Sequence, residues 1–146
     1  MNAPSRSKIN EMATDCVAVR VRILNRVISG IYDDALRPLG LGAGQLNVLI
    51  VVGRLENPRV SEIAEVLRMD QSTVSRNIKP LLRDGLLSSS SDEADARAQR
   101  ISLTRRGVAK IDQAYPAWKA AQTNARKLVG DSLDDVISRL TPADPS

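Results

Sequence analysis

The sequence contains no histidine and a single cysteine among its 146 residues. One cysteine cannot form a disulfide within the chain, and zinc sites built from cysteine and histidine need more of these ligands. The lack of histidine also excludes a Ser-His-Asp triad and a Cys-His nucleophile pair. Only Cys16 is left as a nucleophile for a small enzyme. We therefore expect a protein that is not an enzyme and that carries no metal and no cofactor.

Aromatic residues and long apolar runs are scarce as well. The chain has one tryptophan, Trp118, two tyrosines, Tyr32 and Tyr115, and no phenylalanine. Its longest apolar run, residues 46–52, is interrupted by Asn47 and falls far short of the ~20 residues that cross a bilayer. No apolar segment follows a basic one at the N-terminus, as it would in a secretory signal. These features predict a cytoplasmic protein with no membrane partner.

The composition that remains is that of an ordinary globular domain. Hydrophobic residues make up 42% and charged residues 26% of the chain, which is enough for one hydrophobic core at this length. The net charge is +4, and the excess of Lys and Arg lies in residues 1–110. A mild basic surplus favours a polyanionic partner through counterion release, but a mixed solvated surface accounts for it equally well.

The N-terminal third predicts helices. Residues 1–8 are polar and indicate a flexible tail. Apolar side chains recur every three or four positions over residues 9–36, which predicts one long helix with a broad apolar stripe. Such a helix exposes more apolar surface than a small monomer tolerates, so it favours pairing with a second chain. Beyond the turn at residues 37–40, residues 45–55 are apolar nearly all round and predict a short core helix.

The middle of the chain predicts two short helices in succession. Ser61 stands where an N-cap is expected for a helix over residues 61–68. Asp70 is a second N-cap candidate, and apolar residues at helical spacing predict a helix over residues 70–84. Pro80 lies inside the second helix, where we expect a bend without a break. Two short helices joined in this way form a helix-turn-helix.

A hairpin and two further helices are predicted behind it. Residues 86–91 and 99–103 are compatible with paired strands around a polar tip. Thr104 then caps a long helix, which Pro116 is expected to kink, and residues 132–140 form a last helix.

This order of elements predicts a mainly α fold with a small β-hairpin wing. It is a winged helix-turn-helix domain flanked by N- and C-terminal helices that pair two chains. We expect the DNA-binding domain over residues 41–107, dimerisation helices over residues 9–40 and 108–141, and a C-terminal tail over residues 142–146.

Three short motifs sit on this framework. They are Asp70-x-Ser-Thr-Val at the start of the second short helix, Asp-x-Arg ending at Arg97 in the hairpin, and Leu-Thr-x-x-Gly ending at Gly107. Each is weak alone, but their order and spacing resemble the multiple antibiotic resistance regulator (MarR) family of bacterial transcription factors over residues 16–128. The resemblance implies a homodimer, usually a repressor, that binds a palindromic operator in double-stranded DNA and is released by a signal. It also implies a helix in the major groove and a wing tip in the minor groove.

The exposed face of the helix over residues 70–84 carries the expected DNA contacts. Short hydroxyls beside free N–H groups at a helix start suit phosphate oxygens. Arginine reaches guanine edges and glutamine reaches adenine edges in the major groove, while a guanidinium at the wing tip suits the negative minor groove. The predicted DNA-binding residues are Gln71, Ser72, Thr73, Ser75, Arg76, Lys79 and Arg97.

These residues also have purely structural interpretations. The three hydroxyls could simply cap the helix, Arg76 could pair with Asp95 or Glu62, and Arg97 could pair with Asp95 inside the wing. A winged helix can also serve as a protein-protein interaction module without DNA binding. In addition, members of the family often have arginine at the positions of Gln71 and Ala96, so we expect weaker or more salt-tolerant binding here.

The resemblance also raises the question of the signal. The family's usual effector is a small aromatic or phenolic anion held between the dimerisation helices and the DNA-binding lobe, and Arg20, Tyr32 and Trp118 are candidate lining residues. One peroxide-sensing branch carries a reactive cysteine near the position of Cys16, whose thiolate Arg20 could favour. The alternative is that Cys16 is a small buried apolar residue. Arg22 and Arg26 share a helix face and are further possible lining residues, but they could equally meet acids of a partner chain.

Overall fold

The structure is a computed structural model that describes residues 5–140. Residues 1–4 and 141–146, which include half of the predicted N-terminal tail and the whole C-terminal one, lie outside the described residues. Helices joined by one antiparallel hairpin confirm the predicted mainly α fold with a wing. The elements are α1 (Arg6–Asp15), α2 (Val17–Leu36), η1 (Arg37–Leu39), α3 (Ala43–Leu55), α4 (Val60–Leu67), α5 (Gln71–Arg83), β1 (Leu87–Ser91), β2 (Gln99–Leu103), α6 (Arg105–Val129) and α7 (Ser132–Leu140).

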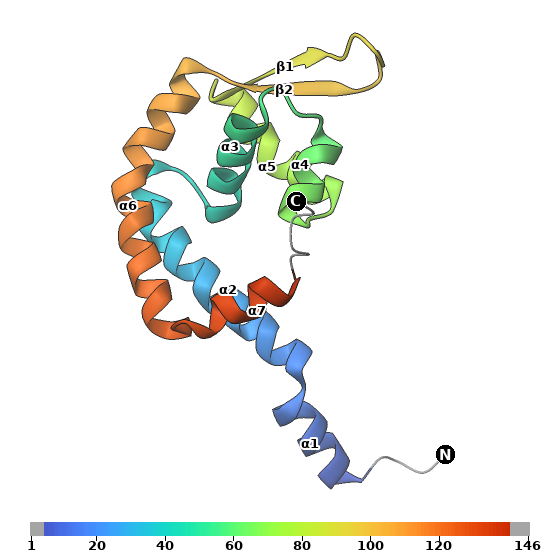
Figure 1. Cartoon of the computed structure of the whole chain (residues 1–146), viewed down its shortest axis with the longest axis vertical. Coiled ribbons are helices and arrows are strands. Elements are labelled where there is room, and N and C mark those ends of the chain that lie inside the picture. Colours follow the sequence, from blue (N-terminus) through green and yellow to red (C-terminus); the bar gives the residue numbers. More distant parts are fainter. Residues whose placement is uncertain (1–4, 141–146) are drawn as a thin grey trace.

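The core lies where α3, α4 and α5 pack beneath the hairpin (Figure 1). α3 is apolar on nearly every face, so it runs through the centre and buries Val48, Leu49 and Val52. Ile63 of α4 and Val74 of α5 complete this cluster and are fully buried. Burial of a side chain of this size stabilises the fold by roughly 1.5–3 kcal/mol. The helix-turn-helix is therefore built on this core, to which Leu36 of α2 and Ala114 of α6 also contribute.

The predicted single helix over residues 9–36 is wrong, because the chain forms two helices that meet at Cys16. Cys16 is extended (φ −62°, ψ 113°), although the apolar periodicity runs through it. The Arg20 guanidinium donates to the Thr14 carbonyl (2.9 Å) and pairs with Asp15 (3.4 Å). A carbonyl left free at the end of α1 thus gains a charged donor, which stabilises the break.

The start of α1 also differs from the prediction. The helix begins at Arg6, so residues 6–8 of the expected flexible tail are helical. The reason is Ser5, whose hydroxyl accepts from the backbone N–H of Lys8 (3.5 Å) and so caps the first turn.

The N-cap predicted at Ser61 is also wrong. α4 starts at Val60, and the capping position belongs to Arg59, whose backbone N–H donates to the Glu62 carboxylate (2.7 Å). Arg59 is held extended by a bridge to Arg100 of β2, and this tertiary contact moves the helix start by one residue. Asp70 does occupy the N-cap of α5, and α5 continues unbroken through Pro80.

The junction between the wing and α6 depends on two residues. The Thr104 hydroxyl accepts from the backbone N–H of Gly107 (3.0 Å) and donates to the Gly85 carbonyl (2.7 Å), which confirms its predicted capping role. A Cβ on Gly107 would lie 2.2 Å from the Leu86 carbonyl oxygen. Only glycine therefore allows α6 to approach the strand this closely.

The terminal helices extend away from this core. α2 and α6 pack against each other (Figure 1). An ion pair between Arg126 and Asp134 (2.7 Å) ties α7 back to α6. No single helix within residues 5–140 is long and apolar enough to cross a membrane. The segment of α2 and η1 has the necessary length and composition only when it is taken together with α3, and the two parts meet at a bend of 82°. Apolar side chains of α1, α2 and α7 are nevertheless exposed: Ile9, Met12, Val17, Val19, Val21, Ile23, Leu24, Val27, Leu133, Val136, Ile137 and Leu140.

Candidate nucleic-acid interface

The outer face of α5 presents the predicted DNA-binding residues to solvent. Val74, Ile78 and Leu81 recur at helical spacing and are buried against the core, so the opposite face must point outwards. The polar residues on that face are Gln71, Ser72, Ser75, Arg76 and Lys79, all exposed, with Thr73 partly buried.

Arg76 forms neither of the two ion pairs that the sequence suggested as alternatives to DNA binding, those with Asp95 and Glu62. Its guanidinium donates to the Thr73 hydroxyl (3.1 Å), and no acid among residues 5–140 lies within ion-pair distance. Glu62, one of the two suggested partners, instead faces Arg100 (3.7 Å). The Arg76 charge is therefore available to an external partner.

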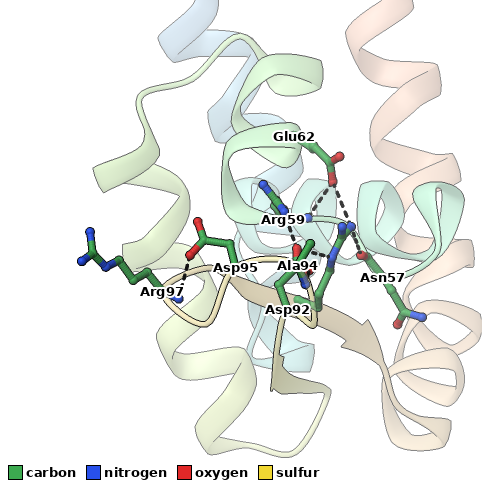
Figure 2. Close-up of polar contacts among 8 residues, drawn as sticks. Asn57, Arg59, Glu62, Asp92, Ala94, Asp95 and Arg97 are labelled. Atoms are coloured by element: carbon green, nitrogen blue, oxygen red, sulfur yellow. Dashed lines mark hydrogen bonds and ion pairs between the residues drawn. The ribbon is translucent and has the colours of Figure 1, made fainter.

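Arg97 lies in the exposed tip of the wing, and the suggested ion pair with Asp95 does not form. The Asp95 carboxylate accepts from the backbone N–H of Arg97 (3.0 Å), which folds the tip into a tight turn. Figure 2 shows the Arg97 guanidinium pointing away from Asp95. The turn thus uses the carboxylate and leaves the guanidinium exposed.

The sequence did not single out Asp92, although its carboxylate is the centre of a cluster of polar contacts at the base of the wing tip. Its side chain is only 5% exposed, and it accepts from Arg59 Nε (2.6 Å), Arg100 Nε (3.0 Å) and the Ala94 backbone N–H (2.9 Å) (Figure 2). The Ala94 N–H, followed by Arg59, lowers the pKa of Asp92 against the opposing effect of burial. In the sequence it stands in a run of polar residues at a loop, which is typical of a solvated acid.

Two adjoining cavities lie between α2, α3 and α6. Their volumes are about 280 and 410 Å³, and they share Trp118, Leu46 and Asn47. Tyr32 lines the first, and Tyr115, stacked on Trp118 with 5.9 Å between ring centroids, lines the second. The structure thus brings two of the predicted pocket residues, Tyr32 and Trp118, together.

The third predicted pocket residue lies elsewhere, because Arg20 is at the α1–α2 break and lines neither cavity. No charged side chain lines them. The Tyr32 hydroxyl donates to the Gln122 side chain of α6, and burial raises the pKa of Tyr32 while the charge of Arg126 opposes the shift. The second cavity is therefore mainly apolar and aromatic, and the first also presents neutral polar groups.

Cys16 occupies the break between α1 and α2 and is partly buried. It belongs to no core cluster, so the expectation of a buried apolar residue does not describe it well. Its thiol has no hydrogen-bond partner within the described part of the chain, and the hydroxyl of Tyr32 is engaged by Gln122 instead.

Comparison with known proteins places this geometry in a family. Residues 41–107 match the model of a winged helix DNA-binding domain. The M. tuberculosis transcriptional regulator MosR, solved in complex with DNA, is 32% identical, with a TM-score of 0.75 over 86% of this chain and 93% of that one. A further MosR structure is 30% identical, with a TM-score of 0.76 over 87% and 93%.

More distant similarities include those to a solved structure and to a further regulator sequence. Wild-type MarR from E. coli is 20% identical, with a TM-score of 0.68 over 86% of this chain and 96% of that one. The HTH-type transcriptional regulator BilQ of Clostridium symbiosum is 28% identical over 80 residues, which span 55% of this chain and just over half (56%) of that relative. The chain therefore belongs to the MarR family of winged-helix, DNA-binding transcriptional regulators.

Proposed function

We propose that the chain forms a homodimer that binds a palindromic operator and represses transcription until a small molecule releases it. The observation that carries this proposal is the outward face of α5, where Arg76 has no acidic partner within residues 5–140. An α-helix fits the major groove of B-DNA, and an unpaired guanidinium there can read guanine.

Each predicted residue has a role in this proposal. The first turn of α5 has free backbone N–H groups, so Ser72, Thr73 and Ser75 bind phosphate oxygens there. Gln71 and Arg76 read base edges, and Lys79 binds the phosphate backbone. Arg97 enters the minor groove, because its exposed guanidinium suits the negative potential of that groove.

The exposed apolar side chains of the terminal helices support the dimer. Val17 of α2 is 73% exposed and Leu140 of α7 is 64% exposed, which is unusual for so many large apolar residues on one part of a small protein. A second copy covers them, with residues 9–40 and 108–141 as the dimerisation parts and residues 41–107 as the DNA-binding part. A two-fold dimer then presents two α5 helices to an inverted repeat.

Selection of bound DNA from random duplexes tests the proposal directly. We expect an enriched inverted repeat with half-site centres about 10–10.5 base pairs, or a multiple of this, apart. Affinity should also fall as the salt concentration rises, as phosphate contacts require. A winged helix used only for protein contacts would enrich no sequence and show no such dependence on salt.

The cavities beside Trp118 are the proposed site of the releasing ligand. Because their lining carries no cation, we expect an uncharged aromatic compound and not the anion that the family resemblance implies. Trp118 is the only tryptophan, so its fluorescence reports occupancy. A compound that releases DNA should change this fluorescence at the same concentration. Release without any change in the signal would place the ligand elsewhere.

A further inference from the structure

The base of the wing is packed on the core through Leu87 and Ile101, and its polar part is bonded to the connection between α3 and α4. The backbone N–H of Ile101 donates to the Pro58 carbonyl (2.9 Å), and Arg100 Nη1 donates to the Asn57 carbonyl (3.1 Å). Residues 88–91 of β1 are all exposed serines and contribute no apolar contact. A two-stranded hairpin is marginally stable by itself, so the orientation of the wing on the domain depends on these bonds together with the core contacts of Leu87 and Ile101.

Asp92 connects this attachment to the tip. On one side its carboxylate receives Arg59, at the start of α4, and Arg100, on β2. On the other side it accepts from the Ala94 N–H, and its own N–H donates to the Ala98 carbonyl (3.0 Å). Arg97 lies inside the loop that the bond between Asp92 and Ala98 closes.

We infer that Asp92 is a positioning residue for DNA binding, which fixes the wing to the first helix of the helix-turn-helix and thereby sets where Arg97 meets DNA. The inference rests on the proposed function, because it needs Arg97 to contact DNA. Asp92 itself touches no DNA: it is buried beneath the two arginines that neutralise it.

Electrostatic repulsion alone and a positioning role predict opposite effects of removing the Asp92 carboxylate. Removing a negative charge from a DNA-binding surface should strengthen binding to any duplex, since phosphates are repelled less. If Asp92 positions the wing, its removal should instead weaken binding to the specific site, because Arg97 loses its fixed place. The sign of the change therefore separates the two accounts.

The test compares Asp92→Asn with Glu93→Gln in the full chain. Both remove one negative charge, but Glu93 is exposed and has no bonded partner among the described residues. Dissociation constants are measured for the selected operator and for an unrelated duplex at several salt concentrations. We expect Asp92→Asn to weaken operator binding about tenfold or more while leaving non-specific binding equal or tighter. Glu93→Gln should weaken neither.

A double-mutant cycle shows whether the effect passes through Arg97. Asp92→Asn should add little to the loss that Arg97→Ala causes alone, because both remove the same contact. Independent, additive losses would overturn the inference, and so would equal loss on operator and unrelated DNA, which indicates general unfolding.

A second variant covers the case in which Asp92→Asn does not fold. Arg59→Lys keeps the charge but loses the Nε–H that meets the carboxylate at 2.6 Å. It should reproduce the loss of operator binding, and wild-type affinity would overturn the inference. If the wild-type protein selects no DNA sequence, the proposed function itself is contradicted.

Discussion

Val27→Asp is expected to convert the proposed dimer into monomers and to weaken operator binding by about a hundredfold or more. Val27 is 50% exposed and lies on α2 in one stripe with Val19 and Ile23, each four positions apart. In a dimer this stripe is covered, and an aspartate buried there without a partner loses its hydration. The two half-sites would then have to be bound one at a time.

Val66→Asp is the matched control. Val66 has the same side chain and nearly the same exposure (48%), but it lies on α4 in the helix-turn-helix. Sedimentation velocity at several concentrations should show a monomer for Val27→Asp and a dimer for Val66→Asp. A Val27→Asp protein that remains dimeric would show that this stripe does not hold the two chains together.

The elements that the sequence predicts well are those with strong local signals. The hairpin strands match to within one residue, and Thr104 caps α6 as its hydroxyl and position suggest. The errors lie where tertiary contacts override local preference. Hydrophobic periodicity passes straight through Cys16, and only the bonds of Arg20 to the end of α1 show why the chain breaks there.

In the candidate site, too, the sequence predicts what depends on a local pattern and misses what depends on tertiary contacts. An amphipathic pattern is enough to place Arg76 and its neighbours on the exposed face of α5, because the face opposite a core is set by helical geometry. Pairings between distant residues cannot be read in this way. Asp92 pairs with Arg59, which lies 33 positions away in the sequence. For Arg97 the sequence suggests the nearby Asp95 as an ion-pair partner, but Asp95 binds the backbone N–H of Arg97 and not its guanidinium.

Arg76→Ala is expected to weaken operator binding by ~1–3 kcal/mol per half-site, and the proposed dimer would bind two half-sites. The loss should be largest for the wild-type base at one position of each half-site, because a guanidinium that reads a base edge also discriminates against the other bases. Its hydrogen bond to Thr73 holds the side chain on the outer face before DNA arrives. Circular dichroism and sedimentation should be unchanged, since Arg76 is exposed and contributes nothing to the core.

Arg83→Ala provides the control on the same helix. Arg83 is an exposed arginine at the other end of α5, where it pairs with Asp84 (3.4 Å), so its removal takes away the same charge far from the helix start. Fluorescence anisotropy with the operator and with every single-base variant of one half-site distinguishes the outcomes. Arg83→Ala should leave base preference intact. If Arg76→Ala weakens all duplexes equally, Arg76 binds phosphate, and the sequence is read by Gln71 or by the shape of the DNA.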